Sequence, residues 1–168
     1  MRKMYDNQWY LQQHYDLSNN SQNSRVQSTV TDYGPYPFSI NIHQAAQRNP
    51  YFRTALWTGK YLQITLMSIL PGEDIGVEMH PNVDQFLRVE QGQGVVQFGD
   101  QQGNLGQVSP IQDDSAIVVP AGTWHNVVNT GNIPLKLYSI YAPPNHPFGT
   151  IHRTKAEAVA AHHHENNG

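Results

Sequence analysis

Four side chains that can donate an electron pair to a metal ion lie on separate short apolar segments: Glu78, His80, Gln85 and His125. Residues two apart on a strand point to the same face, so Glu78 and His80 are expected to share one. The imidazole nitrogens and the Glu78 carboxylate resemble a three-ligand open metal site, and Gln85 adds a weaker fourth ligand. The sequence therefore predicts one divalent metal ion, whose remaining positions take water or substrate oxygens.

Each candidate ligand also has an ordinary structural explanation. Taken singly, either histidine would be a satisfied core or surface residue, the glutamate an exposed strand carboxylate and the glutamine a turn residue. Asp84 precedes Gln85 and would replace it as a ligand if the turn were one residue shorter. The chain contains no cysteine, so a metal must be held by imidazole, carboxylate and amide oxygen. Zinc, iron, manganese and nickel all fit such a set.

The elements that position these residues are short strands separated by Gly and Pro, a pattern typical of an all-β sandwich or barrel. Strands are expected at residues 61–69, 76–80, 85–90, 94–98, 116–119, 124–128 and 135–141. A short helix is expected at 40–47, ended by Asn49-Pro50 because a residue before proline avoids the helical region. The capping-box sequence Thr154-Lys155-Ala156-Glu157 predicts a second helix that extends to about residue 161.

Composition divides the chain into three parts. Residues 1–34 are rich in Gln, Asn, Ser and Tyr and are expected to be a mostly disordered polar tail. The aromatic residues of this tail would either dock on a partner or remain solvated. Residues 35–145 are expected to form the barrel domain, and 146–168 a helix and polar tail. In that tail, His162, His163 and His164 either bind metal adventitiously or are simply solvated.

The spacing of the candidate ligands resembles the two motifs of the cupin superfamily, G-x5-H-x-H-x3,4-E-x6-G and G-x5-P-x-G-x2-H-x3-N. The matching runs are Gly72-x5-Glu78-Met79-His80-x4-Gln85-x6-Gly92 and Pro120-Ala121-Gly122-x2-His125-x3-Asn129, with Asp114 in place of the second leading Gly. The resemblance implies a single double-stranded β-helix over about residues 52–145, with the four ligand positions at one metal.

Two ligand positions depart from that pattern. Glu78 stands where the pattern has its first His, and Gln85 stands where it has Glu. Both replacements offer an oxygen, and the set contains one carboxylate in either arrangement. The departure argues against activities that resemble germin-type oxalate oxidation, in which three His and a Glu hold manganese.

A narrower resemblance links Glu78-Met79-His80-Pro81 to the Gln-x-His-Pro element of zinc-dependent phosphomannose isomerases, which are themselves cupins. It implies aldose–ketose isomerisation of a sugar phosphate. No phosphate-binding cluster is obvious, although Arg53, Lys60 and Arg88 are available. The segments at residues 52–59, 85–92 and 137–144 resemble small bacterial single-domain cupins, which implies a fold rather than a function.

Strand parity predicts the lining of the pocket around the metal. If Gln85 points inward, so do Leu87 and Val89, and Val127 follows His125 inward. Tyr138 and Tyr141 have opposite parity, so at most one of them can face the site. Either tyrosine could instead be an aromatic residue of the core. Arg88 and Glu90 are expected to point outward as surface charges. Such a largely apolar pocket around a polar metal suits a small organic ligand.

Charge and hydropathy exclude several other classes of protein. Charged residues make up 14% of the chain and the formal net charge is −3, so no basic nucleic-acid surface is expected. No apolar stretch approaches the roughly 18 residues that span a bilayer. The N-terminal positive charges have no apolar segment behind them, so a secretory signal is not expected and the cytoplasm is the default location.

Three functions fit the sequence. The first is a divalent-metal enzyme, an isomerase or dioxygenase acting on a small oxygenated molecule such as a sugar or sugar phosphate. The second is a non-catalytic module that binds a carbohydrate or metabolite. The third is a structural coat or assembly protein that makes its contacts through residues 1–34. A homodimer is expected through the strands before Gly72, since a lone barrel leaves edge strands and apolar residues uncovered.

Overall fold

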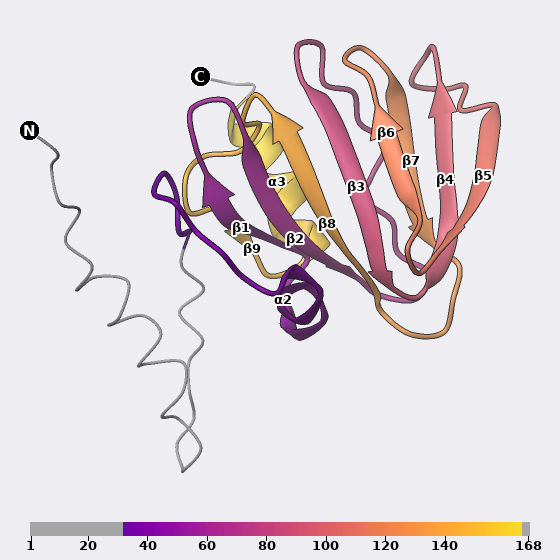
Figure 1. Ribbon diagram of the computed structural model, residues 1–168. Helices are drawn as coiled ribbons and strands as arrows, with labels where there is room; N and C mark the ends of the chain where they lie inside the picture. The colour runs from indigo at the N-terminus through magenta and orange to yellow at the C-terminus, as the bar shows by residue number, and fades with distance from the viewer. Residues whose placement is uncertain (1–31, 166–168) are drawn as a thin grey trace, which may run out of the picture.

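The chain folds as two β-sheets that face each other (Figure 1). The computed structural model describes residues 32–165, and only the backbone of 162–165. The large sheet has the strand order β6-β3-β8-β2-β1-β9 and the small sheet β5-β4-β7. The strands are β1 (Arg53–Thr58), β2 (Gln63–Ile69), β3 (Asp84–Gln91), β4 (Gln93–Gly99), β5 (Gln107–Gln112), β6 (Ala116–Val119), β7 (Trp124–Asn129), β8 (Leu135–Ala142) and β9 (Ile151–His152). The all-β class predicted from the sequence is confirmed.

The predicted strand at residues 76–80 is replaced by an irregular segment that runs beside β7. Asp74 and Glu78 form isolated bridges with Val128 and His125, respectively. The Glu78 N–H donates to the His125 carbonyl over 3.0 Å, and the His125 N–H donates to the Glu78 carbonyl over 2.9 Å. The segment therefore lies against the edge strand of the small sheet.

Alternate residues of the central strands point between the two sheets and form the interior core. Residues directly opposite each other on neighbouring strands share a face. Met67, Leu137 and Val89 are paired in this way across β2, β8 and β3 and form one interior row. Other buried apolar residues complete the core: Ile69, Leu87, Val96, Ile111, Ile117, Val119, Val127 and Leu135. Each such side chain contributes about 1.5–3 kcal/mol through its burial.

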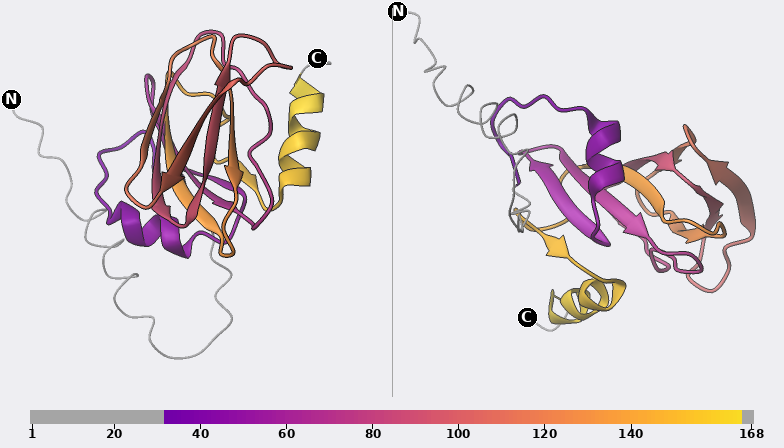
Figure 2. Two further views of the ribbon diagram at one scale, coloured as in Figure 1. Left: turned by 90° about the vertical axis from the view of Figure 1, so that its right-hand side faces the viewer. Right: turned by 90° about the horizontal axis from the view of Figure 1, so that it is seen from below.

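Helix α2 (Ile42–Arg48) covers the outer face of the large sheet (Figure 2). It begins after Asn41, whose side chain accepts a hydrogen bond from the Gln44 N–H, and ends at Asn49 before Pro50. Its Ala46 packs with Leu56 of β1 and Leu66 of β2 in a second apolar cluster. The predicted helix is confirmed, and it covers the outer face of the strands that were expected to meet a partner subunit.

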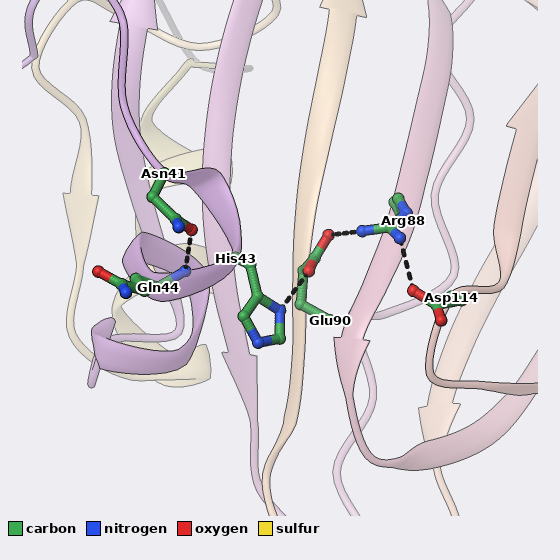
Figure 3. A network of polar contacts seen from close by, with 6 residues as sticks. All are labelled: Asn41, His43, Gln44, Arg88, Glu90 and Asp114. Atoms are coloured by element: carbon green, nitrogen blue, oxygen red, sulfur yellow. Dashed lines mark hydrogen bonds and ion pairs between the residues drawn. The ribbon is translucent and has the colours of Figure 1, made fainter.

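A chain of charged side chains also joins α2 to β3 (Figure 3). His43 of α2 contacts Glu90 over 2.7 Å, Arg88 pairs with Glu90, and Arg88 also pairs with Asp114. Arg88 and Glu90 point outward, as parity predicts. Glu90, however, is only 4% exposed because α2 packs over it, so it is a buried ion-pair residue rather than a surface charge.

Helix α3 (Lys155–Glu165) lies on the opposite side of the molecule from α2 (Figure 2). The Thr154 hydroxyl accepts from the Glu157 N–H over 3.2 Å, and the Glu157 carboxylate accepts from the Arg153 N–H over 2.7 Å. These contacts agree with the predicted capping box. Ala158 of this helix is buried in the interior core.

The structured domain begins at least as early as Asp32, inside the segment predicted to be a tail. The Asp32 carboxylate accepts hydrogen bonds from the N–H groups of Gly34, Thr58 and Gly149 and from the Thr58 hydroxyl. The predictions for residues 1–31 and for the side chains of His162–His164 lie outside the described residues. Within the described part of the chain, no helix is long and apolar enough to cross a membrane.

Candidate metal centre

The backbone pairing of Glu78 with His125 positions the first two candidate ligands. Because the two residues form an antiparallel bridge, their side chains point to the same face of the small sheet. His80 lies two residues beyond Glu78, and its carbonyl accepts from the Gly122 N–H over 2.8 Å. This bond ties the His80 segment to the turn that precedes β7. Residues from both sequence motifs thus meet at one place.

Asp84, the alternative to Gln85 as a ligand, has a different role in the structure. Its carboxylate is exposed and accepts a hydrogen bond from the Ala121 N–H over 2.9 Å. Asp84 therefore holds the turn before β7 in place. Gln85 is 2% exposed and pairs with Tyr141 of β8 on the interior face.

The carboxylate and imidazole atoms lie at distances that suit a shared metal ion. The Glu78 Oε1 atom lies 3.4 Å from the Nε2 atom of His80 and 3.4 Å from that of His125. Ligand atoms of all three residues lie within 4.8 Å of one another. Metal–ligand bonds of about 2.0–2.1 Å in a tetrahedral site would separate neighbouring ligand atoms by about 3.3 Å.

The four predicted ligands share one unusual property. Each has a buried atom that makes no hydrogen bond of regular geometry: Glu78 Oε1, His80 Nε2, Gln85 Oε1 and His125 Nε2. Three of them contact only one another, since Glu78 Oε1 lies in ion-pair range of both imidazole nitrogens. Buried polar atoms are nearly always hydrogen-bonded, because an unpaired one costs about 1–3 kcal/mol. Four such atoms on the four predicted ligand residues fit a site that is completed by a metal ion.

Two contacts orient these donor atoms. The Nδ1 atom of His125 lies 3.0 Å from the Thr123 carbonyl oxygen and donates to it, which leaves Nε2 facing Glu78. The Gln85 amide nitrogen donates to the Ser139 hydroxyl over 2.9 Å, which leaves its Oε1 atom to act as an acceptor or ligand.

Glu78 is ionised in this environment. Its burial alone would raise its pKa, but interactions with His125 and then His80 outweigh that effect. The charge of Arg53 acts in the same direction, so the pKa of Glu78 lies well below its usual value. The carboxylate is therefore available to a cation without first losing a proton.

Tyr141 is the aromatic residue that faces the candidate metal centre. Its ring meets the His80 ring edge to face, with 5.8 Å between centroids, and the His146 ring lies 5.1 Å away on its other side. Burial, together with the Glu78 charge, raises the pKa of Tyr141. Its hydroxyl therefore remains protonated at neutral pH and can donate a hydrogen bond.

Of the residues predicted to line the pocket, the apolar ones Leu87, Val89 and Val127 are fully buried in the interior core. Tyr141 also points inward. Tyr138 lies on the opposite face, where it packs in the outer cluster with Leu66. The inclusion of Tyr138 is thus corrected: its strand parity places it beneath α2.

Two interior polar residues were not predicted as part of the site. Arg53 and Thr65 are 1% and 0% exposed, and both carry buried polar atoms that lack a hydrogen-bond partner. A signal for Thr65 exists in the sequence, since it shares parity with Gln63 and Met67 on one strand. Arg53 lies outside both motifs and was considered only as an available cation.

Comparisons with known proteins agree with this fold. Residues 65–141 match the family model described as "Cupin domain". The uncharacterized protein YrkC of Bacillus subtilis is 69% identical over 132 residues, which cover 79% of this chain and 71% of YrkC. The uncharacterized protein L612 of Acanthamoeba polyphaga mimivirus is 39% identical over 115 residues, covering 68% of this chain and 70% of L612.

The crystal structure of BH2720 from Bacillus halodurans superimposes with a TM-score of 0.77 at 65% identity. The superposition covers 78% of this chain and 99% of BH2720.

Proposed function

Because the chain belongs to the cupin family, with its double-stranded β-helix, we propose that it binds one divalent metal ion through Glu78, His80, Gln85 and His125. The observation that carries this proposal is the convergence of buried donor atoms on these residues that make no regular hydrogen bond, with the two imidazoles and the carboxylate at metal-sharing distances. The proposed activity is that of a metalloenzyme acting on a small oxygenated molecule.

The residues around the site support such chemistry. A divalent ion held there would supply Lewis acidity toward a hydroxyl or carbonyl oxygen. The Tyr141 ring meets the His80 ring, and its protonated hydroxyl is a candidate general acid. The buried side chains of Leu87 and Val127 exclude bulk water, which strengthens electrostatic interactions inside the barrel. Both isomerase and oxygenase reactions are compatible with this arrangement.

The metal content of purified protein tests the proposal. The protein is prepared without chelator or metal-affinity steps, and every sample carries His162→Ala, His163→Ala and His164→Ala so that the C-terminal histidines contribute no signal. We expect about one equivalent of a single transition metal per chain. Glu78→Gln removes the ligand charge while keeping the side-chain shape, and we expect it to lower metal affinity at least about tenfold.

Glu73→Gln is the matched control, because it removes a nearby carboxylate that is not among the grouped ligands. It should leave the metal content unchanged. The proposal would be overturned by protein that contains no metal and takes up none of zinc, manganese, iron or nickel. A metal that binds equally well to Glu78→Gln would also overturn the ligand assignment.

A further inference from the structure

Arg53 is a buried cation with two guanidinium nitrogens that make no hydrogen bond. It is 1% exposed, and its Nε and Nη1 atoms have no hydrogen-bond acceptor. Among the described residues, it takes part in none of the ion pairs, and its guanidinium group lies 5.5 Å from the centroid of the Phe52 ring. An arginine keeps its charge inside a protein, so leaving it unpaired there is costly. Such a residue calls for an anion.

The side chain of Arg53 points into the interior that contains the candidate metal centre. Arg53 pairs with Met67 across β1 and β2, and Met67 belongs to the interior core. Its positive charge also acts on both Glu78 and Tyr141. The guanidinium group therefore lies within electrostatic range of a proposed metal ligand and of the tyrosine beside it.

Two buried hydroxyl groups lie on the same interior face. Thr65 Oγ1 and the Tyr141 hydroxyl make no hydrogen bond of regular geometry, although Tyr141 interacts with Thr65 and Ser139. Thr65 pairs with Ser139 of β8, which places it on the interior face between the Arg53 and Tyr141 levels of the sheet. The guanidinium and hydroxyl groups thus form a second set of buried polar atoms without regular hydrogen bonds, distinct from the four proposed metal ligands.

The charges in the interior also favour an anion. Glu78 is the single carboxylate in the described cluster of potential ligands. Arg53 and Glu78 carry opposite charges, so a divalent metal would add positive charge to the interior. A bound anion would offset that charge.

We infer that the molecule bound in this interior is a small carboxylate, whose carboxylate group pairs with Arg53 while a hydroxyl or carbonyl oxygen of the same molecule approaches the metal. This inference rests on the proposed metal site and specifies its ligand class. The Thr65 and Tyr141 hydroxyls hydrogen-bond to the same molecule.

A carboxylate fits better than a phosphate because one cation faces the interior. The remaining Lys and Arg side chains of residues 32–165 are exposed or bind groups outside it, as with Lys136 on the Asn49 carbonyl and Lys155 on Asp74. Phosphate groups are typically bound by several charge-assisted donors or by a helix N-terminus.

Binding of four small acids to the metal-loaded protein tests this inference. Saturation-transfer NMR titrations use the acids glycolate, lactate, pyruvate and galacturonate. Their neutral counterparts are, in the same order, ethylene glycol, propane-1,2-diol, hydroxyacetone and galactose. Inorganic phosphate is titrated as a further comparison. We expect at least one acid to bind about tenfold more tightly than its neutral counterpart. We expect Arg53→Met to abolish that preference with unchanged metal content, and the exposed Arg48→Met to preserve it.

A stability measurement separates a binding role of Arg53 from a structural one. Met has similar bulk and no charge, so Arg53→Met should be at least as stable as the parent protein without ligand. The acid should raise the melting temperature of the parent protein but not of Arg53→Met.

If the protein contains metal, any of four outcomes would overturn the inference. They are that no acid binds, that an acid and its neutral counterpart bind equally well, that phosphate binds more tightly than every acid, or that Arg53→Met is less stable than the parent protein. Absence of metal, measured first on the same samples, would instead count against the proposed function.

Discussion

At the scale of single residues, the site depends on where one carboxylate stands. Glu78 faces His125 across a backbone bridge, and its Oε1 atom is equally far from both imidazoles. Gln85 is held through its amide nitrogen by Ser139, so its oxygen is the atom left over. The exchange of residue types relative to the family pattern therefore keeps four donor atoms together while moving the charge from β3 to the irregular segment beside β7.

The closing glycine of the first motif, Gly92, occupies a position that does not readily accept a side chain. Gly92 has a φ of +96°, and a Cβ atom added there would lie 3.2 Å from both the Leu135 Cα atom and the Pro134 carbonyl oxygen. We predict that Gly92→Ala lowers the free energy of unfolding by about 1–3 kcal/mol, through backbone strain and this close approach. Urea denaturation measures the change.

Gly103→Ala is the control for that prediction, since an added Cβ atom at Gly103 meets nothing within 4 Å. It should alter stability by less than about 0.5 kcal/mol. Equal stability of the two variants would show that the motif glycine is not needed for the turn between β3 and β4.

At the scale of secondary-structure elements, Asp32 connects three separate segments of the chain. Its carboxylate accepts hydrogen bonds from Gly34, from Thr58 at the end of β1, and from Gly149 in the loop before β9. We predict that Asp32→Ala lowers the free energy of unfolding by about 2–4 kcal/mol, because several donors lose their acceptor at once. Thermal and urea denaturation both report this loss.

Asp113→Ala is a suitable comparison, because Asp113 is an exposed carboxylate on the loop after β5. Its replacement is expected to be nearly neutral. If Asp32→Ala is no more destabilising than Asp113→Ala, the three segments are held together by other contacts.

The sequence predicts those elements whose apolar residues follow a clear period. The segments at 85–90, 116–119 and 135–141 alternate or form short apolar runs, and they become β3, β6 and β8. Strand β5 escaped prediction because it is a largely exposed edge strand that contains Pro110. Strand β9 has two residues, which is too short for any period to appear.

The residues of the candidate site also fall into those that the sequence could predict and those that it could not. The metal-ligand positions could be proposed because their spacing matches a family pattern, and the structure gathers the two imidazoles and the carboxylate. The burial of Arg53 could not be predicted, because a polar residue inside a strand gives no apolar pattern, and Thr65 had only its parity with Met67 to indicate it. Their position becomes visible only when β1 and β2 are paired and the interior face is known.

At the scale of the whole molecule, the barrel separates an outer face from a polar centre. Helix α2 covers the outer face of β1 and β2, with the His43–Glu90 contact at its edge (Figure 3). The homodimer expected through these strands stays a prediction. The interior face carries both apolar core residues and the buried polar groups of the candidate site.

Anomalous X-ray diffraction from crystals of the zinc-loaded protein tests the central claim most directly. Data collected on either side of the zinc absorption edge locate the ion independently of any assay. The account predicts a single peak per chain, about 2.0–2.2 Å from donor atoms of Glu78, His80, Gln85 and His125. A chain that binds zinc only at other positions, or a peak whose ligands omit both Glu78 and His125, would contradict it.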